Sequence, residues 1–204
     1  MDAAHVRVGQ GGFGASSRLS GGTRHAKKNA TDAEIIVFQD EAHIRDSQAI
    51  GATWYLPGHQ QRVLTTGRHA AAILFGAVAP ATGQVVIAEA DQATAQTFQA
   101  FLDTVLATFP DQTIHLVLDN AKIHHAQILA PYLAAHPQLD LRFLPPYSPN
   151  LNNVERLWKW LREKVILNTY VPNLAAIQAA IGRFLEYLST VPDEIHSRLG
   201  RLPE

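Results

Sequence analysis

The sequence predicts an α/β protein in which helices flank a mixed β-sheet. Residues 34–40, Glu-Ile-Ile-Val-Phe-Gln-Asp, form a continuous β-branched and aromatic run that is typical of a buried central strand. Two further apolar runs, 71–78 and 84–88, are separated by Pro80-Ala81-Thr82-Gly83, which predicts a hairpin. Beyond residue 94, segments of helical period alternate with short apolar runs, the pattern of strands joined by crossover helices.

The elements after the hairpin follow from the spacing of apolar residues. A helix is expected from Thr94, because apolar residues recur at helical spacing until Pro110. The members of this face are Phe98, Phe101, Leu102, Val105, Leu106 and Phe109. A strand at 114–118, a helix at about 125–135 and a strand at 139–143 come next.

Two amphipathic helices, at about 151–167 and 174–188, complete the pattern. The order is β-β-β-α-β-α-β-α with an additional C-terminal helix, and right-handed crossovers restrict it to a mixed sheet with helices on its faces. Residues 34–190 are expected to form one domain. Residues 1–33 hold glycine pairs and lack apolar periodicity, which predicts a flexible tail or linker remnant, and 191–204 are expected to be a C-terminal tail.

The composition limits the kind of site and the location that the chain can have. Its 204 residues include no cysteine, so any metal must be held by oxygen or imidazole ligands. The formal charge of -1 argues against a strongly basic nucleic-acid binder, although the acidic residues concentrate in the middle of the chain. The longest apolar run, 70–79, is far shorter than the ~20 residues that cross a bilayer, and no secretion signal precedes it. We therefore expect a cytoplasmic protein.

Three carboxylates form the candidate site. Asp40 and Asp119 end two predicted strands, where ligands commonly bind in α/β sheets, and Glu155 lies at the start of a packed helix. Three carboxylates within a few ångströms repel one another unless they are protonated or neutralised by a cation. Oxygen ligands with open positions suit Mg²⁺ or Mn²⁺. Two such ions about 4 Å apart can activate a hydroxyl and stabilise the leaving oxygen of a phosphodiester.

Four stretches of the chain carry a resemblance to a known family. They are Val37-Phe38-Gln39-Asp40-Glu41, Trp54-Tyr55-Leu56-Pro57-Gly58, Leu118-Asp119-Asn120-Ala121-Lys122-Ile123-His124 and the longest, Leu144-Pro145-Pro146-Tyr147-Ser148-Pro149-Asn150-Leu151-Asn152-Asn153-Val154-Glu155-Arg156-Leu157-Trp158. Together they resemble the transposases of bacterial insertion sequences related to the mariner elements, whose catalytic domain is ribonuclease-H-like and carries an Asp-Asp-Glu triad. The 35 residues between Asp119 and Glu155 are similar to the family's spacing, and the match covers roughly residues 35–168.

By this resemblance, Asp40, Asp119 and Glu155 are the catalytic and metal-binding triad of a DDE domain, which would hold two Mg²⁺ ions with Mn²⁺ able to substitute. The implied activity is metal-dependent DNA cleavage followed by strand transfer, which moves an insertion sequence into TA targets. The implied partners are DNA, as transposon ends and target, and a second copy of the chain in a homodimer. A nucleoid-associated enzyme with no membrane partner is expected.

Two features depart from the family pattern. Asn153 stands where the family usually has proline, and the change is expected to loosen the start of the helix that carries Glu155. Members of the family also usually carry N-terminal helix-turn-helix modules, which residues 1–33 cannot supply. We therefore expect a catalytic half, from a truncated gene or the second frame of a split one, with the helix-turn-helix part encoded separately.

Five residues are candidates for DNA contact: Lys122, His124, Arg156, Lys159 and Arg162. Lys159 and Arg162 lie within about 40° of Glu155 around the predicted helix, where they are able to hold a phosphate. A solvated helix face explains them equally well. The resemblance assigns His124 either to DNA contact or to orienting a carboxylate, and metal ligation by His124 is less favoured.

Other interpretations stay open at this point. Asn152 and Glu155 have the spacing of a capping box, and Asp119-Asn120 fits a strand-to-turn pair. The alternative function is a decayed or domesticated fragment that binds DNA or a partner without cutting. A ribonuclease-H-like nuclease or resolvase would hydrolyse DNA without strand transfer.

Overall fold

A computed structural model of the protein describes residues 7–9, 33–46, 51, 54, 62–63, 70–145 and 151–199. Most of the expected N-terminal tail therefore lies outside the described residues. So do residues 146–150, which make up most of the proline-rich connector before the Glu155 helix.

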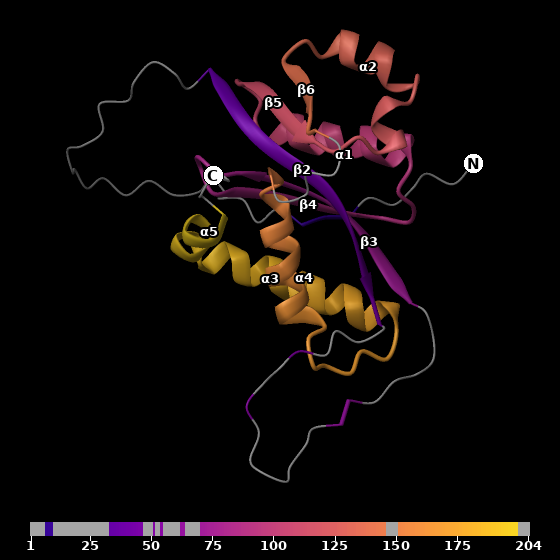
Figure 1. The fold of residues 1–204 in the computed structure, drawn as a ribbon, viewed down its shortest axis with the longest axis vertical. Coiled ribbons are helices and arrows are strands. Elements are labelled where there is room, and N and C mark those ends of the chain that lie inside the picture. Colours follow the sequence, from indigo (N-terminus) through magenta and orange to yellow (C-terminus); the bar gives the residue numbers. More distant parts are fainter. Residues whose placement is uncertain are drawn as a thin grey trace, which may run out of the picture.

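The strands form one mixed sheet, as the sequence predicts (Figure 1). Its members are β1 (Arg7–Gly9), β2 (Glu34–Arg45), β3 (Ala71–Ala79), β4 (Gln84–Ala90), β5 (Thr113–Leu118) and β6 (Leu139–Phe143), in the spatial order β1-β4-β3-β2-β5-β6. The pairs β1/β4, β4/β3 and β3/β2 are antiparallel, whereas β5 is parallel to β2 and to β6. Counted from β2, the order is 3-2-1-4-5, which is that of a ribonuclease-H-like sheet.

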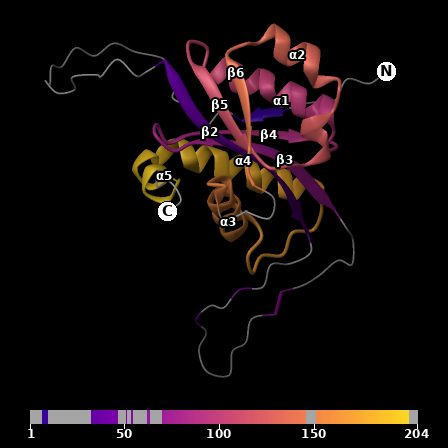
Figure 2. The same cartoon turned by 45° about the horizontal axis from the view of Figure 1, so that its top comes forward.

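Helices cover both faces of this sheet (Figures 1 and 2). They are α1 (Ala95–Thr108), the 3-10 turn η1 (Lys122–His125), α2 (Leu129–Ala135), α3 (Val154–Val165), α4 (Leu174–Thr190) and α5 (Pro192–Leu199). The core between the sheet and α1 and α2 is separate from the core between the sheet and α3, α4 and α5. Among the described residues, no helix combines the length and apolar character needed to cross a membrane.

Strand β2 supplies both cores, because successive side chains of a strand point to opposite faces. Ile35 and Val37 are buried in the core under α1, whereas Phe38 and Ile44 are buried in the core under α3 and α4. The residues in the middle of β2 therefore alternate between two different environments.

Four elements differ from the sequence prediction. β1 lies within the stretch that was expected to be a flexible tail, and it pairs with β4. β2 continues five residues past Asp40, because its pairing with β3 persists after its pairing with β5 has ended. The helix expected from residue 125 starts only at Leu129, after the η1 turn. The expected C-terminal tail contains α5, whose buried Ile195 and Leu199 are too few to give a recognisable periodic pattern.

Candidate active site

Asp40 and Asp119 lie on or directly after two neighbouring parallel strands, β2 and β5. The last pair in their register is Phe38 with Val117, and each aspartate follows two residues later. β5 ends at Leu118, so Asp119 stands on the loop with its side chain 54% exposed. Asp40 instead remains inside β2, opposite Gly76 of β3, which corrects the expectation that it ends its strand.

The Asp40 carboxyl faces the α3 side of the sheet, where it is partly buried. The indole Nε1–H of Trp158 donates to its Oδ2 over 3.1 Å. Burial, together with the negative charges of Glu155 and Glu41, raises the pKa of Asp40 from 3.8 to about 7. The shift indicates a carboxylate that lacks a counter-charge and lies near two other acids.

Glu155 lies in the first turn of α3 and is exposed. The position of this turn is fixed by the buried Asn152, whose Nδ2 donates to the backbone oxygen of Gln39 over 2.9 Å. The same side chain accepts from the backbone N–H of Val154 through Oδ1. The start of the Glu155 helix is thus tied to the residue that precedes Asp40. The N-cap residue of α3 is Asn153, which makes no side-chain capping bond, and in the described part of the chain no hydrogen bond joins the Glu155 side chain to the backbone N–H of Asn152. The capping-box interpretation of Glu155 is therefore not supported.

Asn153 does not leave the helix start loose. Its φ of -63° is the value that proline would impose, and the side chain is buried. Its Nδ2 donates to the backbone oxygen of Leu199, the last residue of α5, over 2.9 Å. A hydrogen bond to the C-terminal helix therefore takes over the restraint that a proline ring would supply.

A second group of polar side chains lies on the α1 side of β2. His124 of η1 is buried, and its Nε2 lies 3.0 Å from Oε1 of Glu41. Its Nδ1 lies 3.2 Å from both the backbone oxygen and Oδ1 of Asp119. Glu41 also accepts from Nε2 of Gln39 over 2.8 Å, and Asp119 accepts from the backbone N–H of Ala121 over the same distance.

The electrostatics of His124 favour its charged form. Burial disfavours an imidazolium, yet the hydrogen bond and charge of Glu41, aided by Asp119, raise the pKa of His124 above 6.5. Both ring nitrogens face carboxylate or carbonyl oxygens, which an imidazolium satisfies by donating on each side. His124 is buried, and its contacts with Glu41 and Asp119 suit the assignment of orienting a carboxylate.

Among the described residues, the group whose ligand atoms lie close enough together to hold a cation is Glu41, Asp119 and His124, with atoms within 4.8 Å of one another. A metal there would displace the protons that hold His124 between the two acids. Asp40, Asp119 and Glu155 supply only hard oxygen atoms, as Mg²⁺ and Mn²⁺ prefer, but the structure does not bring all three within that distance. A cation near Asp40 would relieve the repulsion that raises its pKa, so the second set suits the ion by its chemistry rather than by its spacing.

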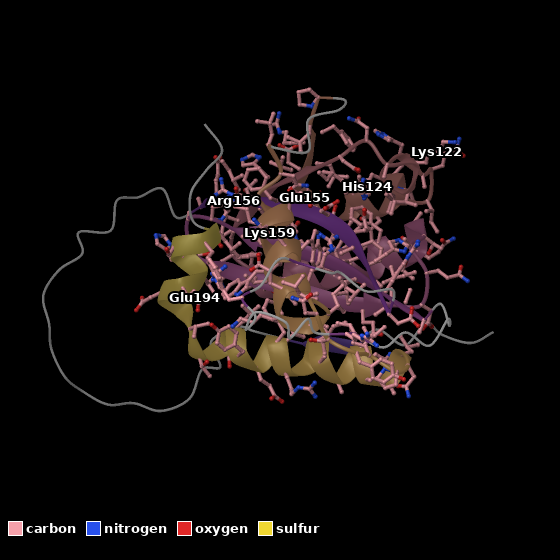
Figure 3. The ribbon with its side chains drawn as sticks, turned by 60° about the horizontal axis from the view of Figure 1, so that its bottom comes forward. Lys122, His124, Glu155, Arg156, Lys159 and Glu194 are labelled. Atoms are coloured by element: carbon pink, nitrogen blue, oxygen red, sulfur yellow. The ribbon has the colours of Figure 1, made fainter. Side chains whose placement is uncertain are left out.

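The basic candidates lie around Glu155 in two groups. Arg156 and Lys159 are exposed on the same helix as Glu155, and Arg162 is half-buried. Lys122 is exposed on η1. In Figure 3, Glu155 lies between Arg156 and Lys159 on one side and His124 on the other, with Lys122 farther along. The acidic centre thus has cations on two of its sides.

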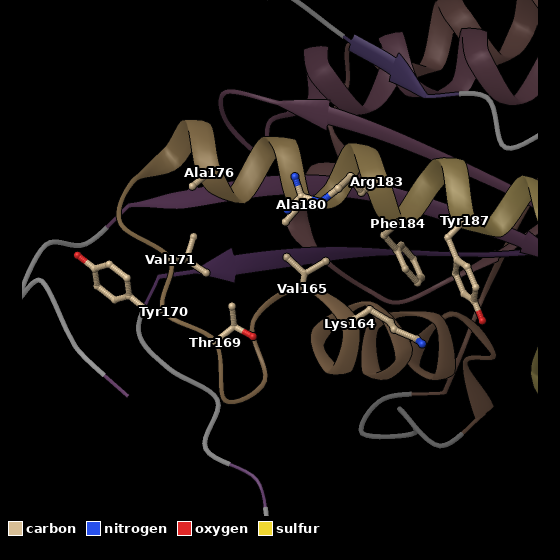
Figure 4. A pocket seen from close by; sticks show the side chains of 10 residues that line it. All are labelled: Lys164, Val165, Thr169, Tyr170, Val171, Ala176, Ala180, Arg183, Phe184 and Tyr187. Carbon is tan, nitrogen blue, oxygen red and sulfur yellow. The ribbon is translucent and has the colours of Figure 1, made fainter. Parts of the chain in front are cut away.

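A separate cavity of about 320 Å³ lies at the opposite end of α3 (Figure 4). Its lining includes Lys164, Tyr170, Arg183 and Tyr187, from α3, α4 and the loop between them. None of the three candidate carboxylates lines it. The candidate active site is therefore the acidic centre rather than this cavity.

Sequence reasoning missed three contributors to the site. Trp158 lies on the apolar stripe of α3, which indicates a core residue and gives no sign of its N–H contact. Glu41 directly follows Asp40, and the alternation of side chains along a strand predicts that it points to the opposite face. Gly76 interrupts an apolar strand, a pattern that can mark the close approach of another group.

Comparison with known proteins gives a family match over most of the chain. The sequence profile of the family described as DDE superfamily endonuclease matches residues 35–178. The insertion element IS630 uncharacterized 39 kDa protein of Shigella sonnei is 32% identical over 174 residues, which cover 84% of this chain and 51% of that protein. The uncharacterized protein y4pE/y4sA of Sinorhizobium fredii is 33% identical over 102 residues, or 48% of this chain and 70% of that protein. The chain thus spans about half the length of the Shigella sonnei protein.

Solved structures match in fold. The Mos1 strand transfer complex aligns with a TM-score of 0.54 at 14% identity, covering 92% of this chain and 68% of that chain. The Mos1 transposase paired-end complex with the left transposon end gives 0.53 at 14% identity, covering 94% and 69%. At this identity the similarity establishes the ribonuclease-H-like fold and nothing finer.

Proposed function

The chain belongs to the DDE superfamily endonuclease family, and from this premise we propose that it is the catalytic domain of an insertion-sequence transposase, which cleaves DNA and transfers strands with Mg²⁺. The observation that supports the proposal is that the three acids stand on neighbouring elements, namely β2, the loop after β5 and the first turn of α3. Asp40 and Asp119 follow the same register pair of parallel strands, and Glu155 lies near enough to raise the pKa of Asp40.

Asp40, Asp119 and Glu155 would hold two Mg²⁺ ions, or Mn²⁺ in their place. Bound there, the ions would activate a water or 3′-hydroxyl and neutralise the leaving oxygen of a phosphodiester. The chain itself would fix where the acids lie. Trp158 and the β2 backbone hold Asp40, Asn152 fixes the start of the Glu155 helix, and His124 holds Asp119.

The proposed DNA partners are the transposon ends and a target, with TA as the target dinucleotide. Arg156, Lys159, Arg162 and Lys122 flank the acidic centre and are our candidates for holding the phosphate backbone. The Mos1 complexes are transposase–DNA assemblies by their names, which supports the same partner here. We further propose that the domain acts as a homodimer.

The test is cleavage of a labelled duplex that carries the ends of the element, in the presence and absence of Mg²⁺. Nicking by the wild-type protein should need Mg²⁺ or Mn²⁺ and stop on chelation with EDTA. Asp119→Asn and Glu155→Gln should each abolish it while circular dichroism shows an unchanged fold.

Three results would count against parts of the proposal. Cleavage that survives EDTA would rule out the metal mechanism. Hydrolysis without joined products would indicate a nuclease or resolvase. Salt-sensitive DNA binding without turnover would indicate a non-catalytic fragment.

A further inference from the structure

Trp158 combines the burial of a core residue with a polar contact to the proposed site. Its side chain is fully buried in the core under α3 and α4, one turn of helix after Glu155. A buried indole N–H usually has a hydrogen-bond partner, and for Trp158 that partner is the carboxylate of Asp40 at 3.1 Å. A hydrogen bond to a charged acceptor is stronger and more directional than one between neutral groups.

The indole can reach Asp40 only because residue 76 has no side chain. Gly76 pairs with Asp40 across β2 and β3, and the six-membered ring of Trp158 lies over it. A Cβ atom at position 76 would lie 2.6 Å from Cζ2 of Trp158, closer than real contacts allow. The glycine therefore admits the ring that aims its N–H at the neighbouring strand.

Trp160, two residues further along α3, shows what the same side chain does without this role. It is equally buried and packs edge-on against Phe184 and Tyr187 of α4. Its Nε1 has no hydrogen-bond partner in the described part of the chain. The two tryptophans thus lie on the same helix and are equally buried, but only the N–H of Trp158 has a hydrogen-bond partner among the described residues.

We propose that Trp158 is a positioning residue for the metal centre, whose N–H orients the Asp40 carboxylate toward the cation in a space that Gly76 provides. The inference rests on the proposed function, because it assumes that Asp40 binds the ion. It assigns to a core tryptophan the task that hydrogen-bonding neighbours of ligating carboxylates commonly perform.

The test is an NMR titration of the ¹⁵N-labelled full chain with Mg²⁺, without DNA. The chain has three tryptophans and hence three indole N–H resonances, which Trp54→Phe, Trp158→Phe and Trp160→Phe assign singly or by elimination. The Trp158 resonance should shift with Mg²⁺, while those of Trp54 and Trp160 stay in place.

Affinity gives a second readout with a matched control. Mg²⁺ binding followed by backbone amide shifts should weaken about 10-fold to 100-fold in Trp158→Phe, which keeps an aromatic ring but loses the N–H. In Trp160→Phe the affinity for Mg²⁺ should change less than about twofold. Asp119→Asn serves as the reference for a lost ligand.

The outcomes separate the two proposals. Suppose that the wild-type chain binds Mg²⁺, that the Trp158 indole resonance does not shift, and that Trp158→Phe and Trp160→Phe bind Mg²⁺ with equal affinity. The positioning role is then wrong and the proposed function is unaffected. If the wild-type chain and Asp119→Asn show the same amide shifts on addition of Mg²⁺, or neither shows any, the proposed metal centre itself is wrong.

Discussion

Asp40 and Glu41 are adjacent on β2 yet belong to opposite sides of the sheet, and the two sides hold their acids in different ways. On the α3 side, Asp40 receives a neutral indole N–H and lies near Glu155, so its negative charge is poorly compensated. On the α1 side, Glu41 contacts the His124 imidazole, which also contacts Asp119. One side therefore sets two acids against each other, whereas on the other side an imidazole with a raised pKa lies between two acids.

This difference predicts unequal effects of neutralising the two acids. Asp40→Asn should lower the rate of metal-dependent DNA cleavage by roughly a thousandfold or more, because it removes a proposed ligand. Glu41→Gln should lower it only about 10-fold to 100-fold, because Glu41 acts on Asp119 through His124. Single-turnover cleavage at saturating DNA measures both. Equal losses would mean that the two sides are not distinct.

The stability of the metal-free protein should depend on pH through Asp40. Since the pKa is raised to about 7, the stability contributed by the protonated form is complete below the ordinary value of 3.8 and is lost as the pH rises through 7. The loss attributable to this residue is up to about 4 kcal/mol. Urea unfolding in EDTA at pH 5 and pH 8 should show the part of this loss that falls between the two pH values, roughly 3 kcal/mol. In Asp40→Asn the difference in unfolding free energy between pH 5 and pH 8 should be smaller.

Filling the space over Gly76 should disturb the α3 side alone. Gly76→Ala forces Trp158 away from the sheet and should destabilise the fold by about 1–3 kcal/mol while impairing cleavage. The control is Gly182→Ala in α4, where a Cβ meets nothing within 4 Å. There the better helix propensity of alanine should add roughly 0.5–1 kcal/mol and leave cleavage unchanged. Thermal and urea unfolding of both variants check this contrast.

The smallest expected effects concern the cations on either side of the centre. Lys122→Ala tests the η1 side and Lys159→Ala the α3 side. A lysine that neutralises one phosphate should reduce the slope of log affinity against log salt by about one on its removal. Fluorescence anisotropy with labelled DNA between low and moderate salt measures that slope. A change in one variant only would indicate the side along which the DNA backbone runs.

The sequence predicted the order of the elements because their apolar patterns are strong. Long, regular apolar faces are buried by α1, by the hairpin β3/β4 and by the amphipathic helices α3 and α4. Strand length is less visible, since β2 beyond Asp40 is held by pairing with β3 rather than by a run of apolar residues. The start of α2 was missed because η1 and a turn, stabilised by tertiary contacts of His124, occupy the residues before it.

The three candidate acids could be proposed from the sequence, but the contacts that hold them could not. Asp119 follows a strand, Glu155 opens a helix, and the spacing of these two acids resembles that of a family. The contacts of Trp158 with Asp40 and of His124 with Glu41 join residues 118 and 83 positions apart in the chain. No local periodicity encodes such contacts, so they required the fold.

The hydrogen bond from Asn152 to the backbone of Gln39 has a mechanical consequence. It fastens α3 to the central strand next to Asp40, and Trp158 fastens the same helix to the Asp40 side chain. Asp40 and the backbone of Glu155 should therefore move as one body. Asp119, on a loop beyond the end of β5, retains more freedom. If the spacing of the acids adjusts between cleavage and joining, we expect that adjustment to come from the Asp119 loop, with the other two as the fixed frame.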